Sequence, residues 1–222
     1  MISEEAPLRR RRRPGQCQKP SGLLGRLVLP LMNWRHSALT DWGLAQARVG
    51  ASDRILDIGC GGGRTLHKLA SLAAGGRVCG VDHAAASVAA SLRFNRGGVE
   101  TGRVVVQQAS VSALPFPDAS FDLVTAFESH FWWPDLPGDV REVWRVLKPG
   151  GRLLIVAEFY DGGKHARYAQ RLARWSGMAA LTREQHRELL ERAGFADVQV
   201  AEEVRRGWIS ARGRRPAAAG GA

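Results

Sequence analysis

Cysteine is scarce in this chain of 222 residues, and the three that occur, Cys17, Cys60 and Cys79, do not have the spacing of metal ligands. An odd and sparse count is typical of proteins from reducing compartments, so we expect a cytoplasmic location. The six histidines are scattered without paired-ligand spacing, and the sequence shows no serine–histidine–aspartate arrangement for nucleophilic catalysis. The sequence therefore predicts no bound metal.

Long apolar runs are also missing. The apolar stretch near the N-terminus, residues 23–32, is interrupted by Arg26 and Pro30 and is too short to cross a membrane. No small-residue cleavage site follows it, so we do not expect a secretory signal. The sequence predicts no membrane span.

Acidic residues are few at the two ends of the chain, which together carry most of the net charge of +11. Residues 1–40 hold eight basic and two acidic residues, whereas residues 41–200 hold 19 and 17. We interpret residues 1–22, which include the run Arg9 to Arg13, as a disordered basic arm and residues 212–222 as a frayed tail. The alternative for the arm is a contact with nucleic acid or anionic lipid. No aromatic side chains lie between its arginines to stack on bases.

The chain does contain a strand, a glycine turn and a helix within residues 54–74. Residues 55–58 are apolar and β-branched, which predicts a buried strand, and residues 65–74 have apolar side chains at helical spacing. Four glycines at 59 and 61–63 let the backbone turn sharply and let a ligand lie against the main chain. The pattern is that of the opening of a nucleotide-binding α/β unit.

Asp57 stands near the end of this strand. Such a carboxylate is usually solvated or paired, but beside a glycine turn it can hold a cationic amine. The dinucleotide fingerprint Gly-x-Gly-x-x-Gly fails from Gly59, because its last position is Arg64, and from Gly61, because its last position is Leu66. The pattern that fits is Asp-x-Gly-x-Gly-x-Gly.

A second acidic residue, Asp82, ends the strand predicted at residues 77–82. It lies 23 residues beyond Gly59, close to the spacing at which such folds place an acid that binds ribose hydroxyls. The alternative is that Asp82 caps the helix predicted at residues 84–94. We favour the ribose role because of the neighbouring glycine motif.

The strand predicted at residues 121–127 is followed by Glu128 and by the mixed aromatic and polar sequence Ser-His-Phe-Trp-Trp-Pro. Ligands of doubly wound sheets bind beyond the carboxyl ends of the strands. Glu128 and His130 can both titrate, so they are candidates for a general base. The alternative is that the aromatic residues, and His130 beside Trp132, only pack against the sheet or shape a pocket.

The other segments alternate between helix and strand. The patterns predict helices at 33–48, 139–147 and 182–193, the last opened by a capping box of Thr182 and Gln185. They predict strands at 104–106 and 152–158 and a closing antiparallel hairpin at 198–204 and 208–211. Pro149 and the two glycines after it are expected to end the helix predicted at 139–147.

The glycine motif, Asp82, the segment 110–124 and the sequence Leu-Lys-Pro-Gly-Gly at 147–151 together resemble the class I S-adenosylmethionine-dependent methyltransferases, in their small-molecule branch. The resemblance implies an α/β fold with a doubly wound, mostly parallel seven-stranded sheet and an antiparallel last strand. It implies cap helices at 23–48 and a methyltransferase domain at 49–211 with a helical lid at 159–181. It also implies S-adenosyl-L-methionine as the cofactor, and it is not specific for the substrate.

The resemblance further implies a set of site residues. His83 would line the adenine, Phe127 would flank the sulfonium through its ring face, and Ser110 stands where the family commonly has an Asp. Helices before the first strand cover the cofactor in this family, so Asn33 and His36 are candidates for that cover. The cofactor-binding residues would be Asp57, Gly59, Cys60, Gly61, Asp82, His83, Ser110, Val111 and Phe127, and the catalytic residues His130 and Glu128, with Glu158 and His165 as other bases.

Three functions stay open at this point. The first is methyl transfer to a small-molecule acceptor, which the aromatic pocket and the lid favour. The second is methylation of nucleic acid, supported only by the basic ends. The third is a non-catalytic module that keeps the cofactor fold.

Overall fold

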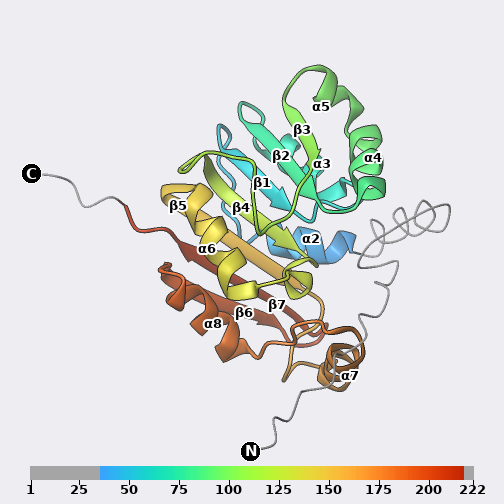
Figure 1. The fold of residues 1–222 in the computed structure, drawn as a ribbon, viewed down its shortest axis with the longest axis vertical. Helices are drawn as coiled ribbons and strands as arrows, with labels where there is room; N and C mark the ends of the chain where they lie inside the picture. Colours follow the sequence, from blue (N-terminus) through green and yellow to red (C-terminus); the bar gives the residue numbers. More distant parts are fainter. Residues whose placement is uncertain (1–35, 218–222) are drawn as a thin grey trace, which may run out of the picture.

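Seven strands form one sheet at the centre of the structure (Figure 1). The computed structural model describes residues 36–217, so the basic arm expected at 1–22 and the first half of the expected cap segment, 23–35, lie outside the described residues. The strands are β1 (Arg54–Ile58), β2 (Arg77–Asp82), β3 (Val104–Gln108), β4 (Phe121–Phe127), β5 (Leu147–Ala157), β6 (Ala196–Glu203) and β7 (Trp208–Arg214).

The sheet has the order β3-β2-β1-β4-β5-β7-β6. Strands β1 to β5 run parallel to their neighbours, and β7 pairs antiparallel with both β5 and β6. The predicted doubly wound, mostly parallel sheet with an antiparallel last strand is therefore confirmed. The chain order reverses between β1 and β4, and in sheets of this kind the ligand crevice opens beyond the carboxyl ends of the strands at that point.

Helices cover both faces of the sheet (Figure 1). One face carries α2 and α3, with α4 packed beside α3, and the other carries α6 and α8. The helices are α2 (Ser37–Leu44), α3 (Arg64–Leu72), α4 (Ala85–Phe94), α5 (Arg96–Glu100), α6 (Leu136–Val146), α7 (Ala166–Ser176) and α8 (Arg183–Arg192), with a 3₁₀ turn η1 (His130–Trp132). Among the described residues, no helix is both long and apolar enough to cross a bilayer.

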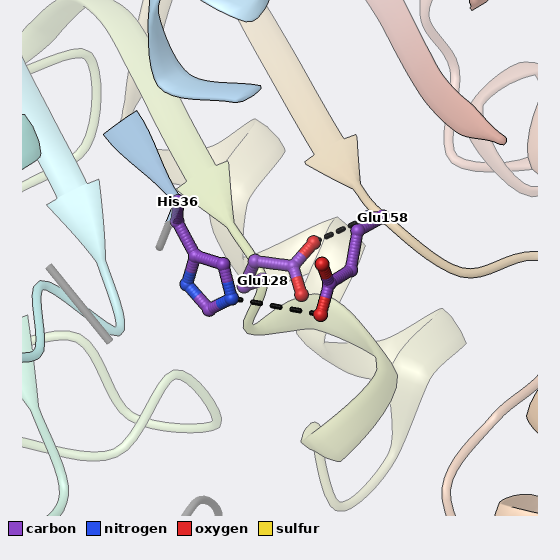
Figure 2. A group of neighbouring side chains, drawn as sticks. All are labelled: His36, Glu128 and Glu158. Carbon is purple, nitrogen blue, oxygen red and sulfur yellow. Dashed lines mark hydrogen bonds and ion pairs between the residues drawn. The ribbon is translucent and has the colours of Figure 1, made fainter. Parts of the chain in front are cut away.

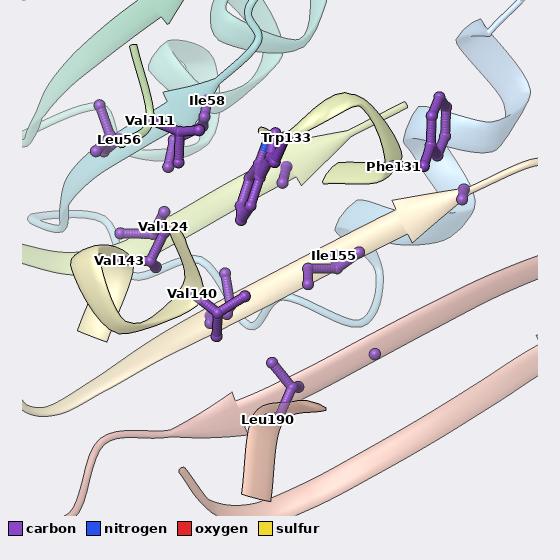
Figure 3. Close-up of a cluster of buried hydrophobic side chains, with 14 of the residues drawn as sticks. Leu56, Ile58, Val111, Val124, Phe131, Trp133, Val140, Val143, Ile155 and Leu190 are labelled. Atoms are coloured by element: carbon purple, nitrogen blue, oxygen red, sulfur yellow. The ribbon is translucent and has the colours of Figure 1, made fainter. Parts of the chain in front are cut away.

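Side chains that alternate along the strands pack into two separate hydrophobic cores, one on each face of the sheet. In β5, Leu153 and Ile155 point to one face, and Leu154 and Val156 point to the other. Figure 3 shows part of the first core, where Val140 and other residues of α6 meet the central strands. Because both faces are buried, the parallel strands read as continuous apolar runs in the sequence.

Helix α8 begins where the sequence predicts. The hydroxyl of Thr182 accepts a hydrogen bond from the Gln185 backbone N–H at 3.2 Å, and the Gln185 side chain accepts one from the Thr182 N–H at 2.8 Å. Two backbone donors of the first turn are thus satisfied, and the capping box is confirmed.

Two predicted boundaries are wrong. Helix α6 ends at Val146, and residues 148–151 belong to the start of β5. Strand β7 runs to Arg214, so the first residues of the expected frayed tail lie in the sheet. The tail is held further by Arg215, which exchanges backbone hydrogen bonds with Gly150 and Gly151 and stacks its guanidinium on the Trp144 ring at 3.7 Å.

The segment 159–181 contains one helix, α7, which is amphipathic and lies at the lower end of the molecule in Figure 1. It buries Ala169 and leaves Trp175 59% exposed. The backbone around it is anchored by the hydrogen bond from the Ala179 N–H to the Phe131 carbonyl at 2.9 Å. The helix expected in this insertion is therefore present.

Candidate functional site

The glycine turn joins the end of β1 to α3 and lies against the end of β2. The backbone N–H groups of Gly59 and Cys60 both donate to the Val81 carbonyl, at 2.8 and 3.1 Å. Gly59 and Gly63 have φ values of +76° and +84°, which favour glycine. A Cβ on Gly59 would also overlap with the Cβ of Ser129, so no other residue fits this turn without displacement.

Asp82 is fixed at the end of β2 by two backbone donors. One carboxylate oxygen accepts from the Gly61 N–H at 3.0 Å and the other from the Ala84 N–H at 2.8 Å. The N-cap residue of α4 is Ala84 and not Asp82. Each carboxylate oxygen has a second lone pair, so Asp82 can accept further hydrogen bonds from a ligand in front of it.

Asp57 is fully buried behind the turn. The Thr125 hydroxyl donates to one of its oxygens at 2.7 Å, while the other oxygen has no hydrogen-bond partner among the described residues. Burial raises the pKa of Asp57 to about 7, the Thr125 hydrogen bond opposes the shift, and the negative charge of Asp82 adds to it. An acid held in this state is stabilised by any cationic group brought close to it.

A cavity of about 380 Å³ opens in front of these groups, at the reversal point of the sheet. Strands β1, β2 and β4, the 3₁₀ turn and helix α2 all contribute to its wall. Its lining includes Gly59, Cys60, Gly61, Asp82, His83, Ser110, Val111, Phe127 and Glu128. Among the described residues, none from 159–181 lines it, so the predicted lid does not form its wall.

The predicted adenine-side residues lie along one part of this wall. His83 is half exposed, and its backbone carbonyl accepts from the Gln108 side chain at 3.0 Å. The Ser110 hydroxyl accepts from the Ser112 N–H at 3.2 Å, while Val111 is buried. These residues form a partly apolar part of the wall against which a flat ring system could lie.

The cavity fits the cofactor that the sequence motif implies. The bare main chain at Gly59 allows close approach, and Asp82 presents acceptor oxygens for vicinal hydroxyls. The unpartnered oxygen of Asp57 lies behind the same turn, in a position that a cationic ligand would stabilise. Asp57 itself is not part of the cavity wall, so any direct contact with a ligand would pass the glycine backbone.

A group of three titratable side chains lies at the β4 and β5 end of the cavity (Figure 2). His36 comes from the start of α2, Glu128 from the end of β4 and Glu158 from the end of β5. His36 Nε2 is 3.5 Å from a Glu158 oxygen, and the Glu128 carboxylate accepts a short hydrogen bond from the Glu158 backbone N–H. One side-chain nitrogen or oxygen atom from each of the three residues lies within 4.8 Å of those of the other two.

Glu128 has a φ of +54°, which is rare for a residue with a side chain. Its backbone N–H donates to the Val156 carbonyl at 2.9 Å, and the hydroxyl of the next residue, Ser129, donates to the Ile58 carbonyl at 2.7 Å. The turn after β4 is therefore tied to both neighbouring strands. Such strain, of about 1–3 kcal/mol, persists where the surrounding structure holds it, and functional sites are where it concentrates.

His130 does not line the cavity, and the sequence-based choice of this residue as the first candidate for a base needs correction. Its side chain is 1% exposed, and its Nε2 lies 3.1 Å from Nε2 of His186 on α8. Burial, followed by the nearby His186, lowers the pKa of His130 well below its usual value. His130 points into the core because η1 turns the chain after Ser129, which no periodicity in the sequence indicates.

Sequence reasoning missed part of the wall. Arg64 and Thr65 line the cavity directly after the glycine motif, and their position beside it was the available signal. Leu39 and Thr40 reach the cavity only because α2 packs across the sheet, so the local sequence carried no signal for them. His36 lines the cavity, and Asn33, its companion candidate, lies outside the described residues.

Known proteins match this chain in sequence and in fold. Residues 56–155 match the family model described as a methyltransferase domain. The chain is 41% identical over 118 residues to 27-O-demethylrifamycin SV methyltransferase of Amycolatopsis mediterranei, across 53% of this chain and 43% of the relative. Residues 56–155 are therefore similar to a methyltransferase domain, and the curated relatives that the chain matches are methyltransferases.

Solved structures with low sequence identity share the fold. YcgJ of Bacillus subtilis superposes with a TM-score of 0.66 at 21% identity, over 82% of this chain and 99% of that chain. Haemonchus contortus phosphoethanolamine N-methyltransferase 2, solved in complex with S-adenosyl-L-methionine, gives 0.68 at 20% identity, over 79% of this chain and 52% of that chain. The chain spans about half the length of the curated relatives it matches, 43 to 58% for the first four.

Proposed function

We propose that this protein transfers a methyl group from S-adenosyl-L-methionine to a small-molecule acceptor. The observation that carries the proposal is the joining, at one cavity, of the glycine turn, the acid Asp82 and the strand-end residues Phe127 and Glu128. The relatives matched above, which include a methyltransferase named for a rifamycin, support the small-molecule acceptor. We place the protein in a reducing compartment such as the cytoplasm, which the free thiols of Cys60 and Cys79 support.

The bound cofactor would supply a methyl group already activated by its sulfonium. The residues of the chain then have to bind, orient and exclude water. Asp82 would hold the ribose hydroxyls, His83, Ser110 and Val111 would border the base, and Gly59 to Gly61 would support the amino-acid end. The ring of Phe127, 8% exposed at the cavity wall, would face the positive charge.

The acceptor would enter beside Glu128 and the two tryptophans Trp132 and Trp133, which line the same cavity. Their rings offer the apolar area that grips a small organic molecule. Among residues 36–217, Glu128 and His36 are the titratable side chains at that end of the wall, so they replace His130 as the groups that could hold the acceptor or take up its proton.

Titration calorimetry with S-adenosyl-L-methionine and with nicotinamide dinucleotides tests the cofactor half of the proposal. We expect heat from S-adenosyl-L-methionine alone. Heat from the dinucleotides alone would overturn the assignment, because the same strand–turn–helix unit also serves dinucleotide folds.

Incorporation of a labelled methyl group tests the acceptor half. The purified protein, with labelled cofactor, is incubated with extracted cell metabolites and separately with total RNA. We expect label in the metabolite fraction. Label confined to RNA would favour the nucleic-acid alternative, and tight cofactor binding with no turnover over a broad acceptor panel would indicate a binding module.

A further inference from the structure

Helix α7 presents a basic and aromatic side at the periphery of the molecule (Figure 1). Its exposed arginines recur every three or four residues and its two exposed aromatic residues lie seven apart, so all of them share about a third of the helix circumference. The opposite side buries Ala169 and packs Leu172 against the first core. We call the exposed side the α7 face; it consists of Arg167, Tyr168, Arg171, Arg174 and Trp175.

The positive charge of the α7 face has little acid near it. The segment 159–181 has four basic residues and one acidic residue, Asp161, whose carboxylate accepts a hydrogen bond from the Gln170 side chain at 2.7 Å. Among the ion pairs formed within residues 36–217, none includes an arginine of the α7 face. The α7 face therefore attracts surfaces of negative charge.

Apolar area is exposed on the same face. Tyr168 is 46% exposed although its ring lies 5.0 Å from that of Phe159, and Trp175, which has an interaction of its own, is 59% exposed. Each ring combines an apolar body with one polar atom, so both suit a boundary between water and an apolar phase. The α7 face thus combines positive charge with large amphipathic rings.

The turn between β6 and β7 extends this surface. The Lys164 side chain, just before α7, donates to the Arg205 carbonyl in the turn at 2.9 Å, which holds the two segments side by side. Val204 is 72% exposed, and Arg205 and Arg206 are also exposed beside the adjoining acid, Glu203. An exposed aliphatic side chain next to two arginines repeats the character of the α7 face.

Both segments lie at the edge of the sheet where the parallel strands end. Helix α7 follows β5, and the turn precedes β7, whose Ile209 pairs with Ala157 at the carboxyl end of β5. The cavity opens at the same edge, but none of the described residues of α7 or of the turn lines it. The combined surface is therefore separate from the wall of the cavity.

We propose that the α7 face and the β6–β7 turn dock this protein onto the surface of an anionic lipid bilayer, with the rings of Tyr168 and Trp175 in the headgroup region. Amphipathic helices that carry arginine on one side and tryptophan beside it bind membranes in this way. Tyrosine and tryptophan are enriched at that depth in membrane proteins.

A bilayer suits this surface better than a single-stranded nucleic acid does. A flat surface can meet the helix and the turn together, and it gives the aliphatic side chain of Val204 an apolar phase to enter. A single strand instead follows a basic groove and stacks its bases on aromatic rings, and Val204 offers no such ring.

The proposal goes beyond the proposed function and does not depend on it, because membrane binding requires neither cofactor nor acceptor. The basic arm expected at residues 1–22 could also attract anionic lipid. The test therefore uses the full chain, keeps that arm in every variant and changes only the α7 face or a matched surface.

Co-sedimentation with lipid vesicles tests the charged part of the surface. We expect the wild-type protein to bind vesicles of phosphatidylcholine with phosphatidylserine, less tightly as salt is added, and to bind phosphatidylcholine alone weakly. The triple variant Arg167→Gln/Arg171→Gln/Arg174→Gln should bind the anionic vesicles about 100-fold more weakly, since each arginine near such a surface contributes roughly a factor of five.

A second triple variant is the control for net charge. Arg77→Gln/Arg93→Gln/Arg96→Gln removes the same charge from exposed positions on β2, on α4 and at the start of α5, which lie far from α7 in Figure 1. It should bind anionic vesicles within about threefold of wild type, because charges beyond the Debye length of about 8 Å are screened.

The double variant Tyr168→Ser/Trp175→Ser tests the rings at constant charge. It should bind anionic vesicles at least about tenfold more weakly than wild type, because the apolar area that enters the headgroup region is lost. Phe94→Ser is its control, since Phe94 is 47% exposed on α4, away from α7. Circular dichroism checks that each variant is folded, and the arginine and ring variants test the face separately.

Three results would overturn the proposal. The first is a wild-type protein that does not bind the anionic vesicles, and the second is an arginine variant that binds them as tightly as its charge-matched control. The third is a ring variant that binds them as tightly as Phe94→Ser, which would leave only loose attraction between charges. Titration of the same variants with single-stranded RNA completes the test: RNA affinity lost in the arginine variant, with vesicle binding unchanged, would identify a nucleic-acid surface instead.

Discussion

The two ends of the cavity are built in different ways. At the end that we propose binds the cofactor (the cofactor end), Gly59, Gly61 and Asp82 lie within two consecutive strand–turn units, and backbone N–H groups hold the side chain of Asp82. At the end that we propose binds the acceptor (the acceptor end), His36, Glu128 and Glu158 come from segments far apart in the sequence, and their side chains lie close together.

This difference suggests that the cofactor end depends on backbone conformation and that the acceptor end depends on side-chain chemistry. A backbone-built site fails when the turn is distorted, and it tolerates changes in neighbouring side chains. A side-chain site can lose its chemistry while the fold and the cofactor affinity survive. Four measurements test this contrast, beginning with the one for which we expect the largest effect.

Gly59→Ala should damage the cofactor end most. The substitution places a Cβ at a φ of +76° and against Ser129, so we expect a loss of about 2–5 kcal/mol in unfolding free energy or a complete loss of cofactor binding. Gly102→Ala is the matched control, because Gly102 has a φ of +70° but nothing within 4 Å of the added Cβ, and it should cost only about 1–2 kcal/mol. Equal losses in the two variants, measured by urea unfolding and calorimetry, would contradict the close packing of the turn.

Asp82→Ala should weaken cofactor binding by about 1.5–3 kcal/mol, because charge-assisted hydrogen bonds to the ribose are lost. Asp82→Asn keeps one acceptor oxygen and should lose less. Calorimetry on both variants checks the order, and circular dichroism checks that both are folded. An affinity that is unchanged in a folded Asp82→Ala variant would show that Asp82 only braces the turn through Gly61 and Ala84.

Asp57 should make cofactor binding depend on pH. Its pKa of about 7 in the folded protein means that the acid is half protonated near neutrality, and a cationic ligand favours the ionised form. Binding should therefore be about tenfold weaker at pH 6 than at pH 8, since one pH unit below the pKa costs about 1.4 kcal/mol.

The stability of the free protein should change in the opposite direction. The folded pKa of Asp57 lies above the unfolded value, so its contribution is fully present below the unfolded pKa and is lost as pH rises through about 7. Asp57→Asn should remove both slopes. A wild-type protein whose cofactor affinity is flat from pH 6 to pH 8 would argue against contact between Asp57 and a cationic group.

Replacing the buried pair His130 and His186 should change turnover least among the four tests. Burial lowers the pKa of each, so the stability they contribute is present above the usual histidine range and is lost as pH falls below about 6.5. The double variant His130→Leu/His186→Leu should reduce the difference in unfolding free energy between pH 7.5 and pH 5.5, by about 1 kcal/mol or more.

Turnover of this double variant at saturating acceptor should stay within about threefold of wild type, since neither side chain lines the cavity. His36→Gln is the contrasting variant, because His36 does line it. A fall of 10²-fold or more in the double variant, with His36→Gln unaffected, would restore His130 as a base and reverse the assignment of the acceptor end.

The local sequence was sufficient for much of the fold. The strands predicted from apolar runs end at Ile58, Asp82 and Phe127, as β1, β2 and β4 do in the structure. The capping box at Thr182 likewise marks the start of α8. These features depend on neighbouring residues along the chain. The start of β5 was misjudged because Pro149 and Gly150 resemble a helix stop. In the structure the backbone of Gly150 and Gly151 pairs with that of Arg215, which is distant in sequence.

The same distinction applies to the site. The sequence by itself was enough to predict that Gly59, Gly61 and Asp82 lie at one cavity, because they follow two adjacent strands whose parallel pairing brings their carboxyl ends to one edge. Only the tertiary structure decided the acceptor end. The turn after β4 sends Glu128 to the cavity and His130 into the core against His186, and the packing of α2 across the sheet brings His36 to Glu158. Contacts between distant segments depend on how helices and the sheet bury their apolar faces against each other. No local sequence pattern indicates such contacts.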